Sequence, residues 1–210
     1  MTELILARHG ETDWNVAEVF RGRADIGLNG TGVKQAELLA EYLSSVRVDA
    51  IYSSPLKRAL RTAEVIARYQ ESRVEVAPGL IDFDYGEWQG LSHQEVKDTY
   101  KGLYGQWVNN PHEVEMPSGE SLDDVSKRAI GVVDSAVARG EGTVVMVSHR
   151  VVNKVLICAL LGLSNAHFWQ VKQDTAAITT FSYRDGRFIL SQHNNTSYLA
   201  PIKQAPLGDF

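Results

Sequence analysis

Two short apolar runs constrain what this chain can fold into more than any other feature. Residues 4–7 read Leu-Ile-Leu-Ala and stop at Arg8, and residues 143–147 read Thr-Val-Val-Met-Val and stop at Ser148. Runs in which apolar residues do not alternate with polar ones are typical of strands buried on both faces. Sheets of such strands are covered by helices on both sides, so the sequence predicts a layered α/β fold.

Helical patterns occupy the stretches between the expected strands. Apolar residues recur at helical spacing over residues 31–45, where Thr31 is the expected N-cap. Ser54 and Pro55 predict an N-cap followed by proline at the first helical position. The other expected elements are a helix at 121–139 capped by Ser121, a helix after residue 150, strands at 49–53 and 74–76, and a hairpin at 177–193 around Asp185-Gly186.

These elements predict an α/β three-layer sandwich with a mostly parallel central sheet and an antiparallel edge. A chain of 210 residues is long enough for one packed core, so we expect a single domain over residues 1–210. Helical crossovers keep strands parallel, and ligands bind outside the carboxyl ends of such strands. His9, Arg58 and His149 each follow one of these ends, so we expect them to converge.

The composition excludes several classes of partner. Lys plus Arg number 21 and Asp plus Glu number 26, and a net charge of −5 is a poor match for nucleic acid. No apolar run approaches the roughly 20 residues that span a bilayer, and Glu3 interrupts any signal peptide, so we expect no membrane partner. Cys158 is the only cysteine and has apolar neighbours, which favours a buried residue and a cytoplasmic protein.

The converging residues have the chemistry of phosphoryl transfer. The guanidinium groups of Arg8 and Arg58 match a phosphomonoester in charge and in bidentate geometry. Neutral His9 would attack phosphorus and form a phosphohistidine that water later opens. His149, in its charged form, would stabilise the transferring group from the opposite side.

The leaving oxygen also needs a general acid. Residues 80–90 offer three carboxylates, and their chemistry does not choose among Asp82, Asp84 and Glu87.

Four blocks of the sequence, in this order, resemble the histidine phosphatase superfamily, whose members are phosphoglycerate-mutase-like. The blocks are Arg8-His9-Gly10, Gly86-Glu87-Trp88-Gln89-Gly90, Pro117-Ser118-Gly119-Glu120-Ser121 and Ser148-His149. Family members usually carry a glutamate four residues before the first glycine of the second block. The matching residue here is Asp82, so the resemblance implies Asp82 as the general acid, one methylene shorter than the usual side chain.

The resemblance also implies the residues that hold the substrate. Asn15 matches a phosphate-contacting asparagine and Gly22 a backbone contact beside the site, while Arg21 and Arg23 stand where substrate-facing residues are common. Arg150 departs from the family, because a small residue commonly follows the second histidine. We expect Arg150 either to contact the leaving portion of the substrate or to pair with a nearby acid.

The function implied by the resemblance is hydrolysis of a small phosphorylated metabolite, with no cofactor and no metal. The stretch between the acid loop and the second histidine is modest, which favours the phosphatase branch over a phosphoglycerate mutase, the alternative. The identity of the metabolite stays open.

Two other function classes stay open. A metal-dependent hydrolase is disfavoured because none of the 6 histidines has metal-ligand spacing. A non-catalytic module that binds a phosphorylated ligand is disfavoured because both histidines and both arginines are present. Nothing beyond the exposed strand of the expected hairpin points to a homodimer.

Overall fold

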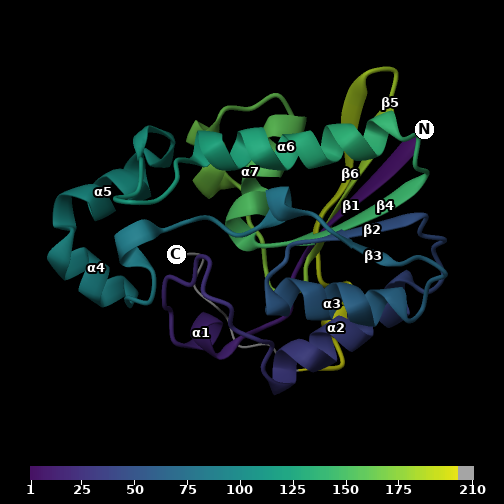
Figure 1. The fold of residues 1–210 in the computed structure, drawn as a ribbon, viewed down its shortest axis with the longest axis horizontal. Helices are drawn as coiled ribbons and strands as arrows, with labels where there is room; N and C mark the ends of the chain where they lie inside the picture. Colours follow the sequence, from purple (N-terminus) through teal and green to yellow (C-terminus); the bar gives the residue numbers. More distant parts are fainter. Residues whose placement is uncertain (203–210) are drawn as a thin grey trace.

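The structure, a computed structural model, describes residues 1–202 and is built on one six-stranded sheet (Figure 1). Its strands are β1 (Thr2–Arg8), β2 (Ala50–Ser53), β3 (Val74–Val76), β4 (Thr143–Ser148), β5 (Ile178–Arg184) and β6 (Arg187–Asn195). The order across the sheet is β3-β2-β4-β1-β5-β6. The first four strands pair in parallel, and β5 and β6 add an antiparallel edge. The predicted α/β sandwich with a mostly parallel sheet is confirmed.

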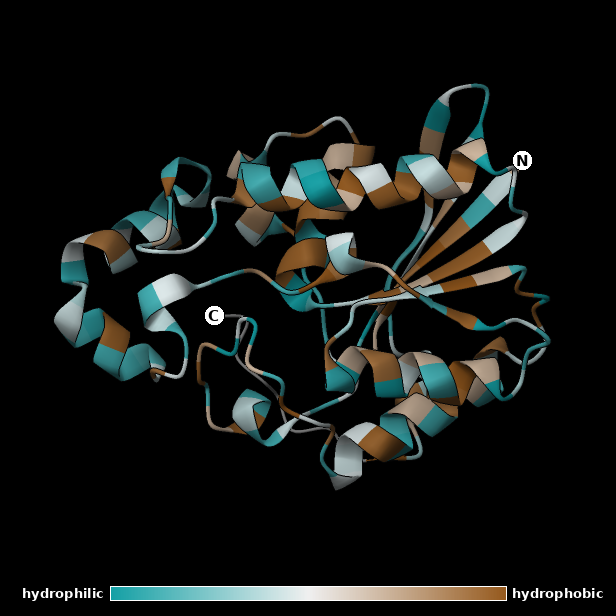
Figure 2. Ribbon diagram, in the orientation of Figure 1, coloured by the Kyte–Doolittle hydropathy of each residue, from teal (hydrophilic) through white to brown (hydrophobic). Residues whose placement is uncertain are grey.

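Helices cover both faces of this sheet. In Figure 1, α2 (Gly30–Leu43) and α3 (Lys57–Ala67) lie on one side, and α6 (Leu122–Ala138) and α7 (Arg150–Leu160) lie on the other. Ile5 of β1 packs in the core on the α2–α3 side, and Leu6 packs in the core on the α6–α7 side. This is why the strands are hydrophobic at successive positions in Figure 2. Burial of each such side chain contributes about 1.5–3 kcal/mol.

Two predicted helix caps are wrong, and one is confirmed. Ser121 caps α6 with Asp124 three residues on, as predicted. Helix α2 begins before Thr31, because Asn29 accepts a hydrogen bond from the Gly32 amide and takes the cap position instead. Helix α3 begins only at Lys57, with Leu56 at the cap position and no side-chain cap.

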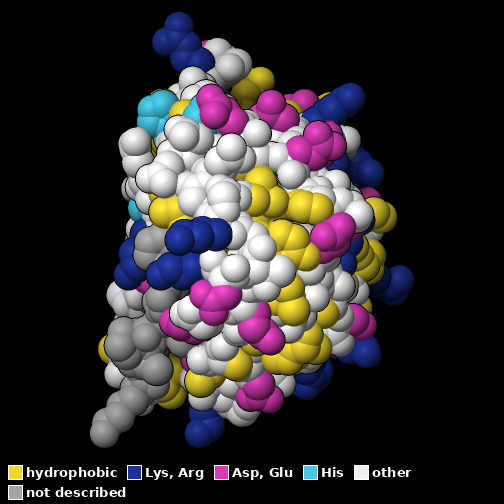
Figure 3. All heavy atoms as spheres, turned by 90° about the vertical axis from the view of Figure 1, so that its left-hand side faces the viewer, with side chains coloured by type: hydrophobic (Ala, Val, Ile, Leu, Met, Phe, Trp, Pro, Cys, Tyr) yellow, Lys and Arg dark blue, Asp and Glu magenta, His cyan; other side chains and the backbone are white. Residues whose placement is uncertain are grey.

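A long excursion between β3 and α6 covers the carboxyl end of the sheet. It contains α4 (His93–Thr99) and α5 (Lys101–Asn109), which project to one side in Figure 1. Buried aromatic rings hold this excursion to the body: Phe83 stacks on Trp107 with ring centroids 5.6 Å apart. Figure 3 views the molecule from this side and shows one compact group of basic side chains beside hydrophobic and acidic ones.

The C-terminal hairpin forms as predicted. Asp185 and Gly186 both have positive φ, 49° and 76°, as the two-residue turn between β5 and β6 requires. Among residues 1–202, no helix is long and apolar enough to cross a membrane.

Candidate active site

The carboxyl end of the sheet brings together the residues expected to converge. His9 directly follows β1, and His149 lies between β4 and α7. Arg58 comes from the first turn of α3. Gly10 lets the loop after β1 approach α2, since a Cβ at this position would lie 2.4 Å from the carbonyl oxygen of Gly32.

The two imidazole rings face each other at the centre of the site. The ring centroids of His9 and His149 are 5.1 Å apart, and the ring planes meet at 60°. Nδ1 of His9 lies 2.6 Å from the carbonyl oxygen of Gly10. A carbonyl only accepts, so Nδ1 carries the proton and Nε2 carries the lone pair. His9 is therefore held in the tautomer that a nucleophile requires.

Both histidines are uncharged in the folded protein at neutral pH. Burial, followed by the charge of Arg58, lowers the pKa of His9 well below the ordinary value of 6.5. Burial and the charge of Arg58 lower the pKa of His149 in the same way. A charged His149 was predicted from the sequence, whereas burial and the surrounding arginines oppose that charge. A bound phosphate dianion acts in the other direction.

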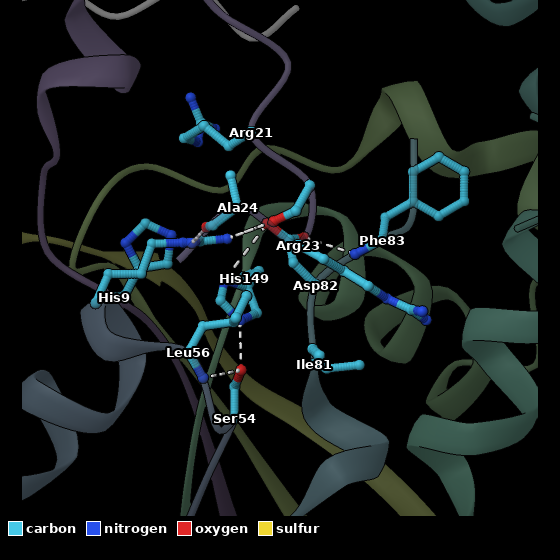
Figure 4. A network of polar contacts seen from close by, with 12 residues as sticks. His9, Arg21, Arg23, Ala24, Ser54, Leu56, Ile81, Asp82, Phe83 and His149 are labelled. Atoms are coloured by element: carbon cyan, nitrogen blue, oxygen red, sulfur yellow. Dashed lines mark hydrogen bonds and ion pairs between the residues drawn. The ribbon is translucent and has the colours of Figure 1, made fainter. Parts of the chain in front are cut away.

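His149 is oriented by Ser54 on one side and faces Asp82 on the other (Figure 4). Its Nε2 lies 2.7 Å from Oγ of Ser54, which also accepts a hydrogen bond from the amide of Leu56 at 3.3 Å. Nδ1 of His149 lies 3.5 Å from Oδ2 of Asp82. A carboxylate only accepts, so the proton of the neutral ring belongs on Nδ1, and Oγ of Ser54 donates to Nε2.

Asp82 is the carboxylate of its loop that reaches His149. Its Oδ2 accepts a hydrogen bond of 2.8 Å from Arg58, and its Oδ1 accepts from the amide of Phe83. The other two candidates point elsewhere. Asp84 accepts from the amide of Gly86 and pairs with Arg23, and Glu87 accepts a hydrogen bond from Tyr100.

Arg58 is wholly buried and connects three segments. Besides Asp82, it donates to the carbonyl oxygens of Gly22 and Ala24 at 2.8 and 2.7 Å. The backbone of Gly22 thus lies beside the site, where the sequence placed it. The Nε atom of Arg58 has no hydrogen-bond partner among the described residues.

A pocket borders this group of residues and shares Asp82 with it. Its wall includes six residues singled out in the sequence, Arg8, Asn15, Arg21, Gly22, Asp82 and Arg150, whereas His9, Arg58 and His149 do not line it. Oδ1 of Asn15 accepts hydrogen bonds from the amide and the hydroxyl of Thr12, so the amide N–H groups of Asn15 are the part that a ligand can contact.

Arg23 has a different place from the one expected. Its guanidinium pairs with Asp84 at 3.0 Å and with Glu120 at 2.7 Å, and Arg23 does not line the pocket. These ion pairs join the first loop to the acid loop, so we assign Arg23 no contact with substrate.

Sequence reasoning missed two residues that hold the site. Ser54 was interpreted as a helix cap. Arg128 of α6 donates to the carbonyl oxygens of Gly79, Ile81 and Asp82 and thereby fixes the backbone of the acid loop. No local pattern identifies Arg128. The one sequence feature that points toward Arg128 is the Pro117–Ser121 block. Its Glu120 accepts a hydrogen bond from Arg128 at 3.0 Å. Within residues 1–202, no group of three or more His, Cys, Asp or Glu side chains could hold a metal ion.

Comparison with known proteins gives one result. The family model described as histidine phosphatase superfamily (branch 1) matches residues 4–196. Phosphoserine phosphatase 1 of Hydrogenobacter thermophilus is 38% identical over 95% of both chains. The solved structure of Bacillus stearothermophilus YhfR has a TM-score of 0.90 at 32% identity, covering 95% of this chain and 100% of that one. A mutant phosphoserine phosphatase from Entamoeba histolytica, solved in complex with phosphoserine, has a TM-score of 0.85 at 32% identity and the same coverage. The chain is therefore a phosphatase of small phosphorylated metabolites and belongs to branch 1 of the histidine phosphatase superfamily.

Proposed function

We propose that this phosphatase works through a phosphohistidine at His9, with Asp82 as general acid. The observation that carries the proposal is the hydrogen bond from Nδ1 of His9 to Gly10, which leaves the lone pair on Nε2 of a ring whose centroid lies 5.1 Å from that of His149. The lowered pKa of His9, caused first by burial, supports the same role, because the ring is neutral when substrate arrives.

In the first step, a bond forms from Nε2 of His9 to phosphorus, and the bond from phosphorus to the leaving oxygen breaks. The proton of Asp82 goes to that oxygen. Arg8, Arg58 and the N–H groups of Asn15 and His149 hold the equatorial oxygens, where charge builds up. The position of Oδ2 of Asp82, 3.5 Å from Nδ1 of His149, supports this arrangement.

In the second step, water attacks phosphorus and the bond to His9 breaks. Asp82, now ionised, takes the proton of the water and is ready for the next turnover.

For the substrate, we propose O-phosphoserine as the first candidate. The support comes from two of the relatives above, which carry the name phosphoserine phosphatase. A phosphoglycerate mutase activity is the alternative. It requires that a second hydroxyl group, rather than water, takes the phosphoryl group from His9.

The test is a phosphate-release assay over a panel of phosphomonoesters that includes O-phosphoserine. Each assay is run with and without a chelator, and with and without 2,3-bisphosphoglycerate. We expect phosphate release that the chelator leaves unchanged. Loss of activity with chelator would favour a metal-dependent hydrolase. Isomerised phosphoglycerate without free phosphate would favour the mutase, and phosphate binding without release would favour a non-catalytic module.

Three further proposals concern the domain organisation, the cellular location and the oligomeric state. We propose that the chain forms one catalytic domain, a prediction whose residues 203–210 lie outside the part that the structure describes. We also propose that the protein works in the cytoplasm, with buried Cys158 as supporting evidence. A homodimer through the edge strand β6 stays a prediction, which sedimentation would test.

A further inference from the structure

Two arginines of the pocket form no direct ion pair with a carboxylate of the described residues, although the charge of Asp82 partly offsets that of Arg21. Arg21 and Arg150 both line the pocket, and no Asp or Glu of residues 1–202 forms an ion pair with either one. Arg150 is only 8% exposed, and its Nε has no hydrogen-bond partner among the described residues. Nε of Arg21 likewise has no hydrogen-bond partner among these residues, while another nitrogen of its guanidinium group donates to the carbonyl oxygen of Trp14.

The two guanidinium groups lie close enough to repel each other. Burial, then the charge of Arg150, lowers the pKa of Arg21 to about 10. His93, which also lines the pocket, is uncharged, because burial and the charges of Arg150 and Arg21 lower its pKa to about 4. The carboxylates of Glu18 and Asp82 line the same pocket. Holding two like charges in a partly desolvated place costs free energy, and an anionic ligand removes that cost.

The phosphoryl group does not need these two arginines. Arg8 and Arg58 already stand beside His9, and in Figure 4 Arg21 is set apart from the group formed by His9, Asp82 and His149. A second anionic group, on the leaving portion of the substrate, fits the cationic wall instead. Guanidinium groups bind a carboxylate through paired N–H donors, and the proposed substrate has one such group.

We infer that Arg21 and Arg150 form a carboxylate subsite, so that the enzyme selects phosphomonoesters whose leaving alcohol carries a carboxylate. This inference rests on the proposed function, because it places the phosphoryl group at His9. Arg150 directly follows His149, the residue proposed to contact the phosphoryl group. A carboxylate bound to Arg150 therefore also positions the substrate for the reaction.

The test uses pairs of substrates that differ only in the carboxylate. O-phosphoserine is compared with O-phosphoethanolamine, and 3-phosphoglycerate with glycerol 3-phosphate. The quantity measured is the ratio of kcat/KM within each pair. We expect the wild-type ratio to favour the carboxylate, and Arg150→Gln and Arg21→Gln each to lower that ratio about 10- to 150-fold, as expected for a hydrogen bond to a charged group. Arg150→Lys keeps the positive charge but lacks the paired N–H donors of the guanidinium group, so its ratio should lie between that of Arg150→Gln and that of the wild type.

Two further variants sharpen the result. Arg61→Gln removes a surface arginine that pairs with Glu64 and should leave the ratio unchanged. The double variant Arg21→Gln/Arg150→Gln should lose less than the product of the single losses, because both side chains bind one group. Circular dichroism checks that each variant is folded, and Arg21→Gln, at a partly exposed position, keeps the test valid if Arg150→Gln does not fold.

Some results would overturn the inference and others would overturn the proposed function. A wild-type ratio near one, or equal losses on both members of a pair, rejects the carboxylate subsite while hydrolysis at His9 stands. A ratio that favours a second phosphate, measured with fructose 1,6-bisphosphate against fructose 6-phosphate, also rejects a carboxylate subsite. If the wild type releases phosphate from none of these esters, the proposed function itself fails.

Discussion

Oγ of Ser54 and Nε2 of His149 lie 2.7 Å apart, both wholly buried, and come from positions 95 residues apart in the sequence. Ser54 directly follows strand β2, and His149 directly follows strand β4. The hydrogen bond between them therefore ties two neighbouring strand ends to one imidazole orientation, with Nδ1 facing Asp82.

Replacing Ser54 with alanine should lower kcat more than it raises KM. The imidazole of His149 loses its one fixed partner and can rotate, and leaving a buried nitrogen unpaired costs about 1–3 kcal/mol of stability. We expect kcat to fall about 10-fold, in line with the loss of one orienting hydrogen bond. Ser53→Ala is the matched control, because the Ser53 hydroxyl donates to the carbonyl oxygen of Ser54 and touches neither histidine. An unchanged kcat in folded Ser54→Ala would reject the orienting role.

Replacing Asp82 with asparagine should affect poor leaving groups far more than good ones. An alkyl ester such as O-phosphoserine needs a proton on the leaving oxygen, whereas an activated aryl phosphate does not. We expect a loss of about 10²- to 10⁴-fold on the alkyl ester and a much smaller loss on the aryl ester. Asp84→Asn and Glu87→Gln, tested alongside, should show no such selectivity. If one of them shows it and Asp82→Asn does not, the acid has been assigned to the wrong residue.

Arg128 should behave as a positioning residue for the same proton transfer. It holds the carbonyl oxygens of Gly79, Ile81 and Asp82, so Arg128→Gln frees the acid loop without touching substrate. We expect Arg128→Gln, like Asp82→Asn, to lose more activity on the alkyl ester than on the aryl ester. The loss should be smaller than for Asp82→Asn, with a decrease in kcat of about 10-fold on O-phosphoserine. Lys127→Gln, at the exposed neighbouring position, is the control. Equal loss on alkyl and aryl esters would show that Arg128 serves only stability.

The pH dependence of stability should reflect the buried histidines. Burial lowers the pKa of His9 and His149 well below 6.5 and that of His93 to about 4, so the folded protein does not bind these protons in mild acid. The unfolded chain does, with pKa values near 6.5. Below about pH 6.5 the unfolded state binds more protons, and stability falls as pH falls.

We therefore expect the free energy of unfolding, measured in phosphate-free buffer, to decrease from about pH 7.5 to about pH 5. His93→Asn should reduce the size of that decrease, whatever its effect at neutral pH. An identical pH dependence of the unfolding free energy in wild type and variant would contradict the lowered pKa of His93.

The sequence was sufficient to predict which strand ends meet, and tertiary contacts decided the rest. Apolar runs at residues 4–7 and 143–147 mark strands covered on both faces, and the residues that follow such strands must share one edge. The convergence of His9 and His149 follows from that geometry alone. Asp82 could not be separated from Asp84 by the residues, because both lie in one loop and only folded contacts distinguish them.

The wrong predictions came from local signals that a distant partner overrides. Ser54-Pro55 has the pattern of a helix start, yet the hydroxyl of Ser54 is used by a histidine in another segment. For Arg23, the family resemblance implies a substrate-facing side chain, which stays a prediction, and the ion pairs of Arg23 with Asp84 and Glu120 become visible only in the fold. Arg128 lies in a helix whose sequence contains no sign of the loop it holds.

The most direct test of the account is to trap the phosphorylated enzyme. Wild-type protein is mixed with substrate, stopped within a single turnover in denaturant at alkaline pH, digested and mapped by mass spectrometry. The account predicts an acid-labile phosphoryl group on His9 that forms and decays at least as fast as kcat, and none in His9→Asn. A phosphoryl group on another residue, or a full turnover with no phosphorylated enzyme, would contradict it.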